Sequence, residues 1–139
     1  MKKILITGAT GFLGSRLVEK MSTIDGLNIL ATGRTLKDQN IFKKSNLEYI
    51  LGDLEDNKFI DSVTSGIDAI IHTAALSSQM GNPKDFHRTN IEVTKQLLKV
   101  AIAKRVKKFI FISSPSVYFR FKHQLELKES DPLPKPINS

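Results

Sequence analysis

The stretch "KILITGATGFLG", residues 3–14, carries the strongest structural signal in the sequence. Its first residues form an apolar run typical of a buried strand, and Gly8, Gly11 and Gly14 follow directly. A helix with one apolar face is expected to begin near Phe12. Glycines between a strand and a helix let a phosphate approach the backbone and the free amides of the helix N-terminus. The alternative is a glycine-rich turn that only lets the helix pack on the sheet.

Short apolar runs alternate with amphipathic stretches as far as Tyr118. Strands are expected at residues 3–7, 27–33, 47–53, 68–75 and 107–114, with helices from about Phe12 and over 56–66 and 85–105. Parallel neighbouring strands need crossover helices, so this alternation of strands and helices predicts an α/β fold with a Rossmann-type, doubly wound parallel sheet of about five strands. Residues 1–118 are expected to form this domain. Residues 119–139 contain three closely spaced prolines and have no clear period, which is typical of a loop and tail.

Composition narrows the class of protein. A chain of 139 residues with 40% hydrophobic and 25% charged residues suits one globular domain, so wholesale disorder is not expected. The absence of cysteine excludes disulfides, thiolate metal sites and a cysteine nucleophile, and is compatible with a reducing cytoplasmic location, which is the one expected. The first apolar run ends at Ile6, so it is too short for a signal peptide, and no stretch reaches the length of a membrane span.

The net charge of +7 raises the question of a nucleic-acid partner, and the densest basic run is "KRVKK" at 104–108. No aromatic residue is interleaved with these cations to stack on bases. Cations at the end of a helix also offset the negative end of its dipole. Neither a nucleic-acid partner nor a membrane is therefore expected.

Five segments occur in an order that resembles the extended short-chain dehydrogenase/reductase family, which includes the NAD-dependent epimerases and dehydratases of nucleotide sugars. They are "TGATGFLG" (7–14), "GDL" (52–54), "HTAA" (72–75), "RTNIEVT" (88–94) and "FISSPSVY" (111–118). The resemblance implies a Rossmann-type domain that binds NAD or NADP. It also implies that Asp53 bonds the adenine amino group, that residues 72–75 pass beside the ribose and pyrophosphate, and that Asn90 holds the centre of the sheet.

On this resemblance, one set of residues is expected to bind the cofactor and no metal is expected. The set is Gly8, Thr10, Gly11, Phe12, Leu13, Gly14, Arg34, Asp53, Leu54, Thr73, Ala74, Ala75, Asn90 and Ser113. Other interpretations stay open for single residues. Asp53 could simply close a strand, His72 is better explained as a packing or hydrogen-bonding residue than as a base, and a buried Asn90 would first need partners for its amide.

The end of the second predicted strand bears on the choice of cofactor. An acidic residue there would bond the ribose hydroxyls of NAD, but this sequence has Gly33 and Arg34. A guanidinium can hold a 2′-phosphate at two points, and the missing carboxylate removes the repulsion that would exclude it. NADP is therefore the favoured cofactor and NAD the alternative, since Arg34 could also stack over the adenine. Lys37 could assist a phosphate.

The segment after the fifth predicted strand contains the candidates for chemistry. The resemblance places the substrate-binding hydroxyl on Ser114, with Ser116 as a second candidate and Ser113 against the cofactor. Tyr118 and Lys122 have the Tyr-x-x-x-Lys spacing of a proton-transfer pair, but the tyrosine follows the strand too closely, so the spacing is interpreted as a coincidence.

The family's active pair lies on a helix further along, which predicts that the chain is truncated before the last strands and the catalytic helix. The resemblance implies an NAD(P)-dependent epimerase, dehydratase or reductase that transfers hydride to or from the hydroxyl or carbonyl group of a small-molecule substrate, for which a nucleotide sugar is the candidate. This chain is then its cofactor-binding part, inactive alone and able to form a homo-oligomer through the open sheet edge. The alternative is a complete, non-catalytic dinucleotide sensor or assembly factor of the same fold.

Overall fold

The computed structural model describes residues 1–36, 44–78, 80–118 and 126–135. Five parallel strands form one sheet in the order β3-β2-β1-β4-β5. Their bounds are β1 Lys2–Thr7, β2 Leu27–Gly33, β3 Leu47–Leu51, β4 Ala69–His72 and β5 Lys108–Phe111. From β1 the chain first adds β2 and β3 on one side of the sheet and then β4 and β5 on the other. The predicted doubly wound parallel sheet is therefore confirmed. In such a sheet, ligands bind beyond the carboxyl ends of the strands at the point where the strand order reverses.

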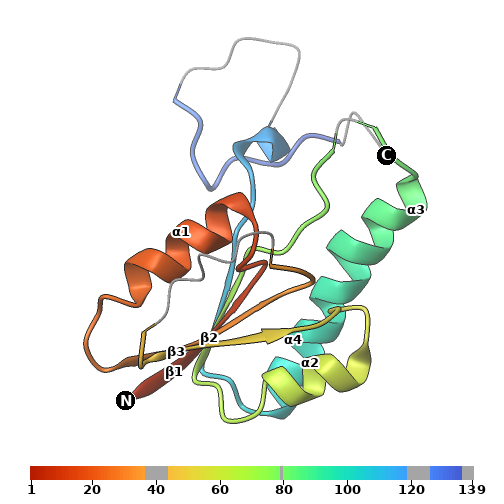
Figure 1. Cartoon of the computed structure of the whole chain (residues 1–139). Coiled ribbons are helices and arrows are strands. Elements are labelled where there is room, and N and C mark those ends of the chain that lie inside the picture. The colour runs from red at the N-terminus through yellow and green to blue at the C-terminus, as the bar shows by residue number, and fades with distance from the viewer. Residues whose placement is uncertain (37–43, 79, 119–125, 136–139) are drawn as a thin grey trace.

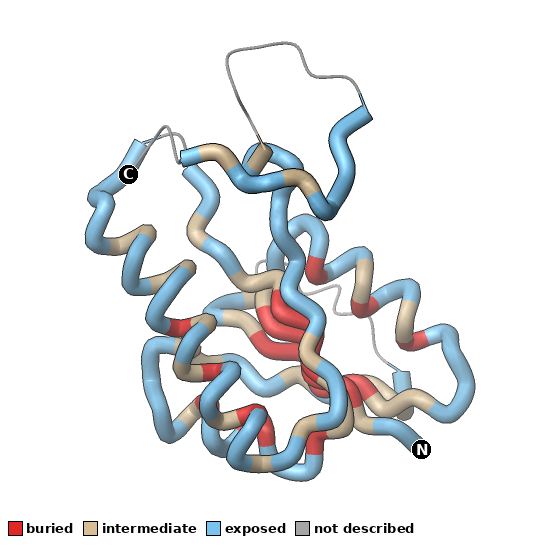
Figure 2. Tube along the Cα trace, turned by 180° about the vertical axis from the view of Figure 1, so that it is seen from behind, coloured by how far each residue is buried: buried red, intermediate tan, exposed pale blue. Residues whose placement is uncertain are grey.

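Helices cover the sheet unequally, as Figure 1 shows. Helix α1 (Phe12–Met21) lies on one face, and α2 (Asn57–Val63) and α4 (Val93–Ala103) lie on the other. The first face buries Val18 against Ile6 and Ile29, while the second buries Leu97 against Leu5. Successive residues of a strand point to opposite faces, which is why β1 serves both cores. The buried residues accordingly gather along the central strands and the inner sides of the helices (Figure 2).

The long helix predicted over 85–105 consists of three consecutive pieces. It begins as α3 (Pro83–Phe86), continues as the π-helix η1 (His87–Glu92) and ends as α4. Hydrophobic periodicity indicates that a helix is present but does not resolve a widened turn within it, so the π-helix was not predicted. Such turns are frequent at functional sites, and this one carries Asn90.

The predicted third, fourth and fifth strands end at residues 51, 72 and 111, earlier than the expected 53, 75 and 114. β1 ends at Thr7, where Gly8 turns the chain with a φ of +68°. Strand β4 pairs with β1, so its strand pairing on that side ends at His72. The amide of Thr73 still donates to the carbonyl of Thr7 at 3.2 Å, and the chain then leaves the sheet. The freed segments after β3 and β4 become walls of the groove described below.

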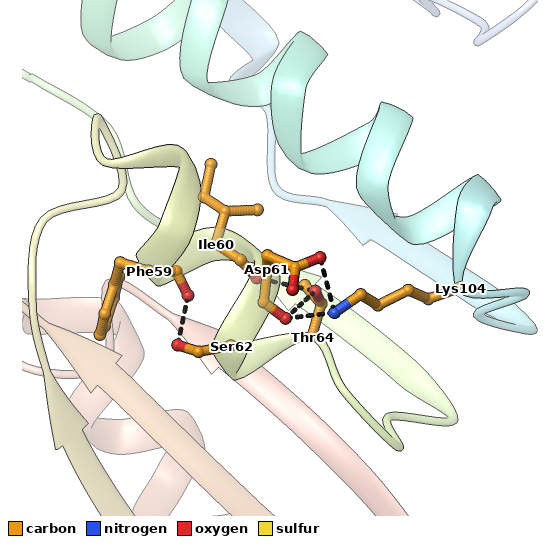
Figure 3. Close-up of polar contacts among 6 residues, drawn as sticks. All are labelled: Phe59, Ile60, Asp61, Ser62, Thr64 and Lys104. Atoms are coloured by element: carbon orange, nitrogen blue, oxygen red, sulfur yellow. Dashed lines mark hydrogen bonds and ion pairs between the residues drawn. The ribbon is translucent and has the colours of Figure 1, made fainter.

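Helix α2 is fixed at its C-terminal end by side chains, as Figure 3 shows. The ammonium of Lys104 binds both the carboxylate of Asp61, at 2.8 Å, and the main-chain carbonyl of the same residue. The hydroxyl of Thr64 donates to the carbonyl of Ile60 at 2.7 Å. The carbonyl of Ile60 also accepts from the backbone amide of Thr64, so the Thr64 hydroxyl is its second donor. The contacts of Lys104 with Asp61 come from the end of α4 and tie α2 to α4.

Strand β5 is the edge of the described sheet beyond β4. Phe109 packs against the core, but the residues at the end of the strand are exposed: Phe111 is 52% exposed and Ile110 41%, and Ile112, directly after the strand, is 40% exposed. Among the described residues, no helix is both long and apolar enough to cross a membrane. Helix η2 (Pro115–Tyr118), a single 3₁₀ turn, follows the strand.

Candidate functional site

The glycine-rich loop joins β1 to α1 and leaves helix amides open to a ligand. Gly11 precedes the helix in an extended conformation, and within the described residues no side chain caps it. The first amides of a helix have no partner within it and carry the positive end of the dipole, so the arrangement suits an anion. A Cβ atom on Gly14 would fall 2.1 Å from the carbonyl oxygen of Gly8, so the loop folds tightly against the helix.

A groove of about 190 Å³ opens beside this loop at the carboxyl ends of the strands. It is lined by residues from the ends of β1 to β4 and from the long helix: Gly8, Thr10, Gly11, Gly33, Arg34, Gly52, Asp53, Leu54, Glu55, Thr73, Ala74, Ala75, Thr89 and Val93. Nine of the predicted cofactor-binding residues are therefore brought together: Gly8, Thr10, Gly11, Arg34, Asp53, Leu54, Thr73, Ala74 and Ala75.

Five lining residues were not in the predicted set, namely Gly33, Gly52, Glu55, Thr89 and Val93. The signal for Gly33 and Gly52 was their position at strand ends, next to predicted residues. Thr89 and Val93 are four apart on the helix, so they share a face, but sequence alone did not show that this face borders the groove. Glu55 had no sequence signal.

The end of the groove at β2 and β3 is built from charged side chains. The Asp53 carboxylate accepts a hydrogen bond from the amide of Glu55 at 2.9 Å, which fixes the turn after β3. The side chain of Arg88 contacts the Glu55 carboxylate at 2.8 Å, and the hydroxyl of Thr89 donates to it at 3.2 Å. These contacts tie the turn to the π-helix. Arg34 is exposed after β2 and supplies a positive charge at this end.

The segment after β4 forms the opposite wall and is held by Asn90. The side-chain oxygen of Asn90 accepts from the amide of Leu76 at 2.7 Å, and its nitrogen donates to the carbonyl of Leu76 at 3.0 Å. Asn90 does not line the groove itself. Its amide is satisfied by the backbone of the wall, which agrees with the structural role considered from the sequence.

His72 lies at the end of β4 with no exposed surface. Its Nδ1 is 2.6 Å from the hydroxyl of Thr7, and its Nε2 is 3.0 Å from the hydroxyl of Thr94. The Thr94 hydroxyl donates to the carbonyl of Asn90 at 2.8 Å, so it accepts from Nε2–H, and Nδ1 accepts from Thr7. Burial lowers the pKa of His72 from 6.5 to about 4, so the ring is neutral at pH 7 and serves as a hydrogen-bonding residue.

The other predicted site residues lie outside the groove lining. Phe12 and Leu13 begin α1 and are 90% and 50% exposed. Gly14 packs against Gly8 instead. Ser113 and Ser114 follow β5 and are exposed.

The segment around the serines is ordered by contacts among its own residues. The hydroxyl of Ser114 lies 2.7 Å from that of Ser116 and accepts from the Ser116 amide at 3.2 Å. The Tyr118 hydroxyl donates to the carbonyl of Glu129 at 3.2 Å. Lys122 and Lys37 lie outside the described residues, so the Tyr118–Lys122 spacing stays a prediction. No group of three or more His, Cys, Asp or Glu side chains in the described ranges is placed to hold a metal ion.

Comparison with known proteins gives one family match and many relatives. The family model described as "NAD dependent epimerase/dehydratase family" matches residues 4–139. Uncharacterized protein YbjS of Escherichia coli (strain K12) is 34% identical over 129 residues, which cover 91% of this chain and 38% of that protein. The dTDP-glucose 4,6-dehydratase of Streptomyces niveus is 32% identical over 132 residues, 84% of this chain and 39% of that enzyme.

Solved structures show the same relationship. A crystal structure of a UDP-glucose 4-epimerase superposes with a TM-score of 0.81 at 28% identity, covering 96% of this chain and 42% of that one. The chain thus spans about two fifths of the length of the proteins that it matches.

Proposed function

Because the chain belongs to the NAD dependent epimerase/dehydratase family, we propose that its groove binds a nicotinamide dinucleotide, with NADP preferred over NAD. We further propose that the chain serves an epimerase, dehydratase or reductase that acts on a hydroxyl or carbonyl group, with a nucleotide sugar as the substrate class. The dehydratase of S. niveus and the solved epimerase carry nucleotide sugars in their names, which supports this class.

One observation carries the proposal: the uncapped N-terminus of α1 opens into the same groove as Asp53 and Arg34. A dinucleotide needs hydrogen-bond donors at its pyrophosphate and polar groups at its adenine end, and the groove offers both. A Cβ atom on Gly8 would fall 2.6 Å from the amide nitrogen of Ala74, so the loop and the facing wall already touch. The residues present therefore fit the cofactor that the family name implies.

Each part of the groove has a distinct task in this proposal. The amides of the 8–14 loop hold the pyrophosphate, Asp53 accepts from the adenine amino group, and Arg34 pairs with a 2′-phosphate. The bound nicotinamide would supply hydride chemistry. Ser114 would donate a hydrogen bond to the substrate oxygen, because its exposed hydroxyl lies on the segment that leaves the sheet beside β4.

Calorimetric titration of the chain with NADP and NAD tests the binding proposal. NADP is expected to bind about tenfold more tightly than NAD, and Arg34→Ser is expected to remove this preference while leaving NAD affinity within about twofold. Lys95→Ser, on the exposed side of α4 and away from the groove, is the matched control. No binding of either dinucleotide would refute the proposed function, whereas equal affinity for both would refute only the role of Arg34.

A further inference from the structure

The wall between residues 73 and 76 is anchored by side chains at both ends. At one end, the hydroxyl of Thr73 donates to the carbonyl of Thr7 at 2.6 Å. At the other end, Leu76 is held by both groups of the Asn90 amide. Ala74 lies between these anchors and packs against Gly8, so the position of the wall determines the width of the groove beside the glycine-rich loop.

His72 connects the two anchors through the protein interior. Its Nδ1 accepts from Thr7, the residue whose carbonyl holds Thr73. Its Nε2–H donates to Thr94, whose hydroxyl in turn donates to the carbonyl of Asn90. The route Thr7–His72–Thr94–Asn90 therefore crosses from the end of β1 through β4 to the π-helix.

The surroundings of the ring leave it little freedom. His72 has no exposed surface and stacks on Phe111 at a ring-centroid distance of 5.8 Å, with Phe109 at 6.1 Å. Both ring nitrogens have partners, and the donor on one and the acceptor on the other can be satisfied only in the Nε2–H tautomer. A leucine could fill much of the volume, but it could not make either hydrogen bond.

We propose that His72 is a positioning residue for the cofactor: through Thr7 and Thr94 it holds both ends of the 73–76 wall and so shapes the groove where the pyrophosphate lies. This inference rests on the proposed function, because it assumes a dinucleotide in the groove. His72 touches neither the cofactor nor the reacting atoms. In the described part of the chain, the adenine end, built from the segments after β2 and β3, shares no hydrogen bond with His72, Thr94 or Asn90. It contacts the π-helix through Arg88 and Thr89 instead, so we expect it to be much less sensitive to His72 than the pyrophosphate end is.

The test compares a complete dinucleotide with a probe of the adenine end. NADP and adenosine 2′-monophosphate, which lacks the 5′-phosphate, are titrated into the wild type and into His72→Gln, His72→Leu and Thr94→Val. Each variant is expected to lose about tenfold in NADP affinity and less than about twofold in affinity for the 2′-monophosphate, with His72→Leu affected most. Gln can retain the donor toward Thr94 and should therefore lose less than Leu.

Thr64→Val controls for lost stability alone. Thr64 is as buried as His72 and its hydroxyl bonds the backbone at 2.7 Å, but it ends α2 and does not line the groove. It should destabilise the fold yet keep both affinities. Circular dichroism before each titration verifies that the variants are folded, and Thr94→Val, which nearly preserves shape, serves if the His72 variants do not fold.

The outcomes separate the two proposals. If the wild type binds neither probe, the proposed function fails and this inference with it. If the wild type binds but the Thr94 and His72 variants match its NADP affinity, or lose both affinities equally, the positioning role of His72 is refuted while dinucleotide binding stands. A ¹⁵N spectrum of the ring that shows Nδ1–H at pH 7 would also refute it.

Discussion

Acid should destabilise this protein through His72 by a predictable amount. The ring is neutral in the folded state, where burial lowers its pKa to about 4, and it regains its ordinary pKa of 6.5 on unfolding. Between these two values the unfolded chain binds a proton that the folded chain does not. The stability is therefore fully present above pH 6.5 and falls by about 1.4 kcal/mol for each pH unit down to about 4, or about 3 kcal/mol in total.

Comparison with His72→Gln isolates this contribution. Glutamine does not titrate, and the remaining groups should titrate alike in both proteins, so their effects cancel in the difference. At pH 7.5 the variant should be less stable by about 1–3 kcal/mol, because a buried hydrogen bond is lost. Only the wild type loses stability in acid through this ring. The difference in free energy of unfolding between the two proteins should therefore shrink by about 2 kcal/mol between pH 7 and pH 5.

Urea unfolding followed by circular dichroism at half-unit pH steps measures the difference directly. The m-value should stay the same in both proteins, so that midpoints report stability. A gap between wild type and variant that stays constant within about 0.5 kcal/mol from pH 7 to pH 5 would refute the claim that the ring stays neutral in the fold. A gap that widens in acid would mean that the folded state stabilises the charged ring instead.

Three further predictions concern stability and binding. Gly14→Ala should lower the free energy of unfolding by about 2 kcal/mol or more in urea titrations, because its Cβ would fall 2.1 Å from a backbone oxygen; an unchanged midpoint would mean that the loop relaxes freely. Lys104→Met should cost about 1–2 kcal/mol in thermal melts because it removes the clamp on α2, whereas Lys95→Met, which breaks an exposed pair, should cost less than about 0.5 kcal/mol; similar losses would contradict this. Asn90→Leu should cost about 2 kcal/mol and weaken NADP more than adenosine 2′-monophosphate, as measured by urea unfolding and calorimetry; unchanged NADP affinity would show that the wall holds without Asn90.

The sheet and the floor of the groove were predictable because local signals specify them. The second strand was predicted at 27–33 and has those bounds, since its largely apolar run lies between Gly26 and Gly33. The glycine loop was predictable because Gly8, Gly11 and Gly14 each sit where a side chain would interfere with a turn, a ligand or the helix. Sequence order alone then brings the ends of β1, β2 and β3 to the same edge.

The walls of the groove were less predictable because they depend on contacts between distant residues. Glu55 lines the groove next to Arg88, a residue 33 positions later on the π-helix, and no local pattern encodes that pairing. The widened helical turn also escapes a search at a fixed period of 3.6 residues. His72 was expected to be a hydrogen-bonding residue, yet neither of its partners, Thr7 and Thr94, was identified from the sequence.

The position of β1 in the centre of the sheet has a consequence for how the chain acquires its structure. β1 precedes both of its neighbours in the chain, and the second of them, β4, lies about 65 residues later. Until that partner emerges, the run Ile4–Ile6 has only β2 beside it, and one edge of an apolar strand stays unpaired. Pairings between distant parallel strands form slowly, so a nascent or refolding chain should pass through an interval in which this strand is open to aggregation. Refolding yield should accordingly fall as protein concentration rises, even where the native state is stable.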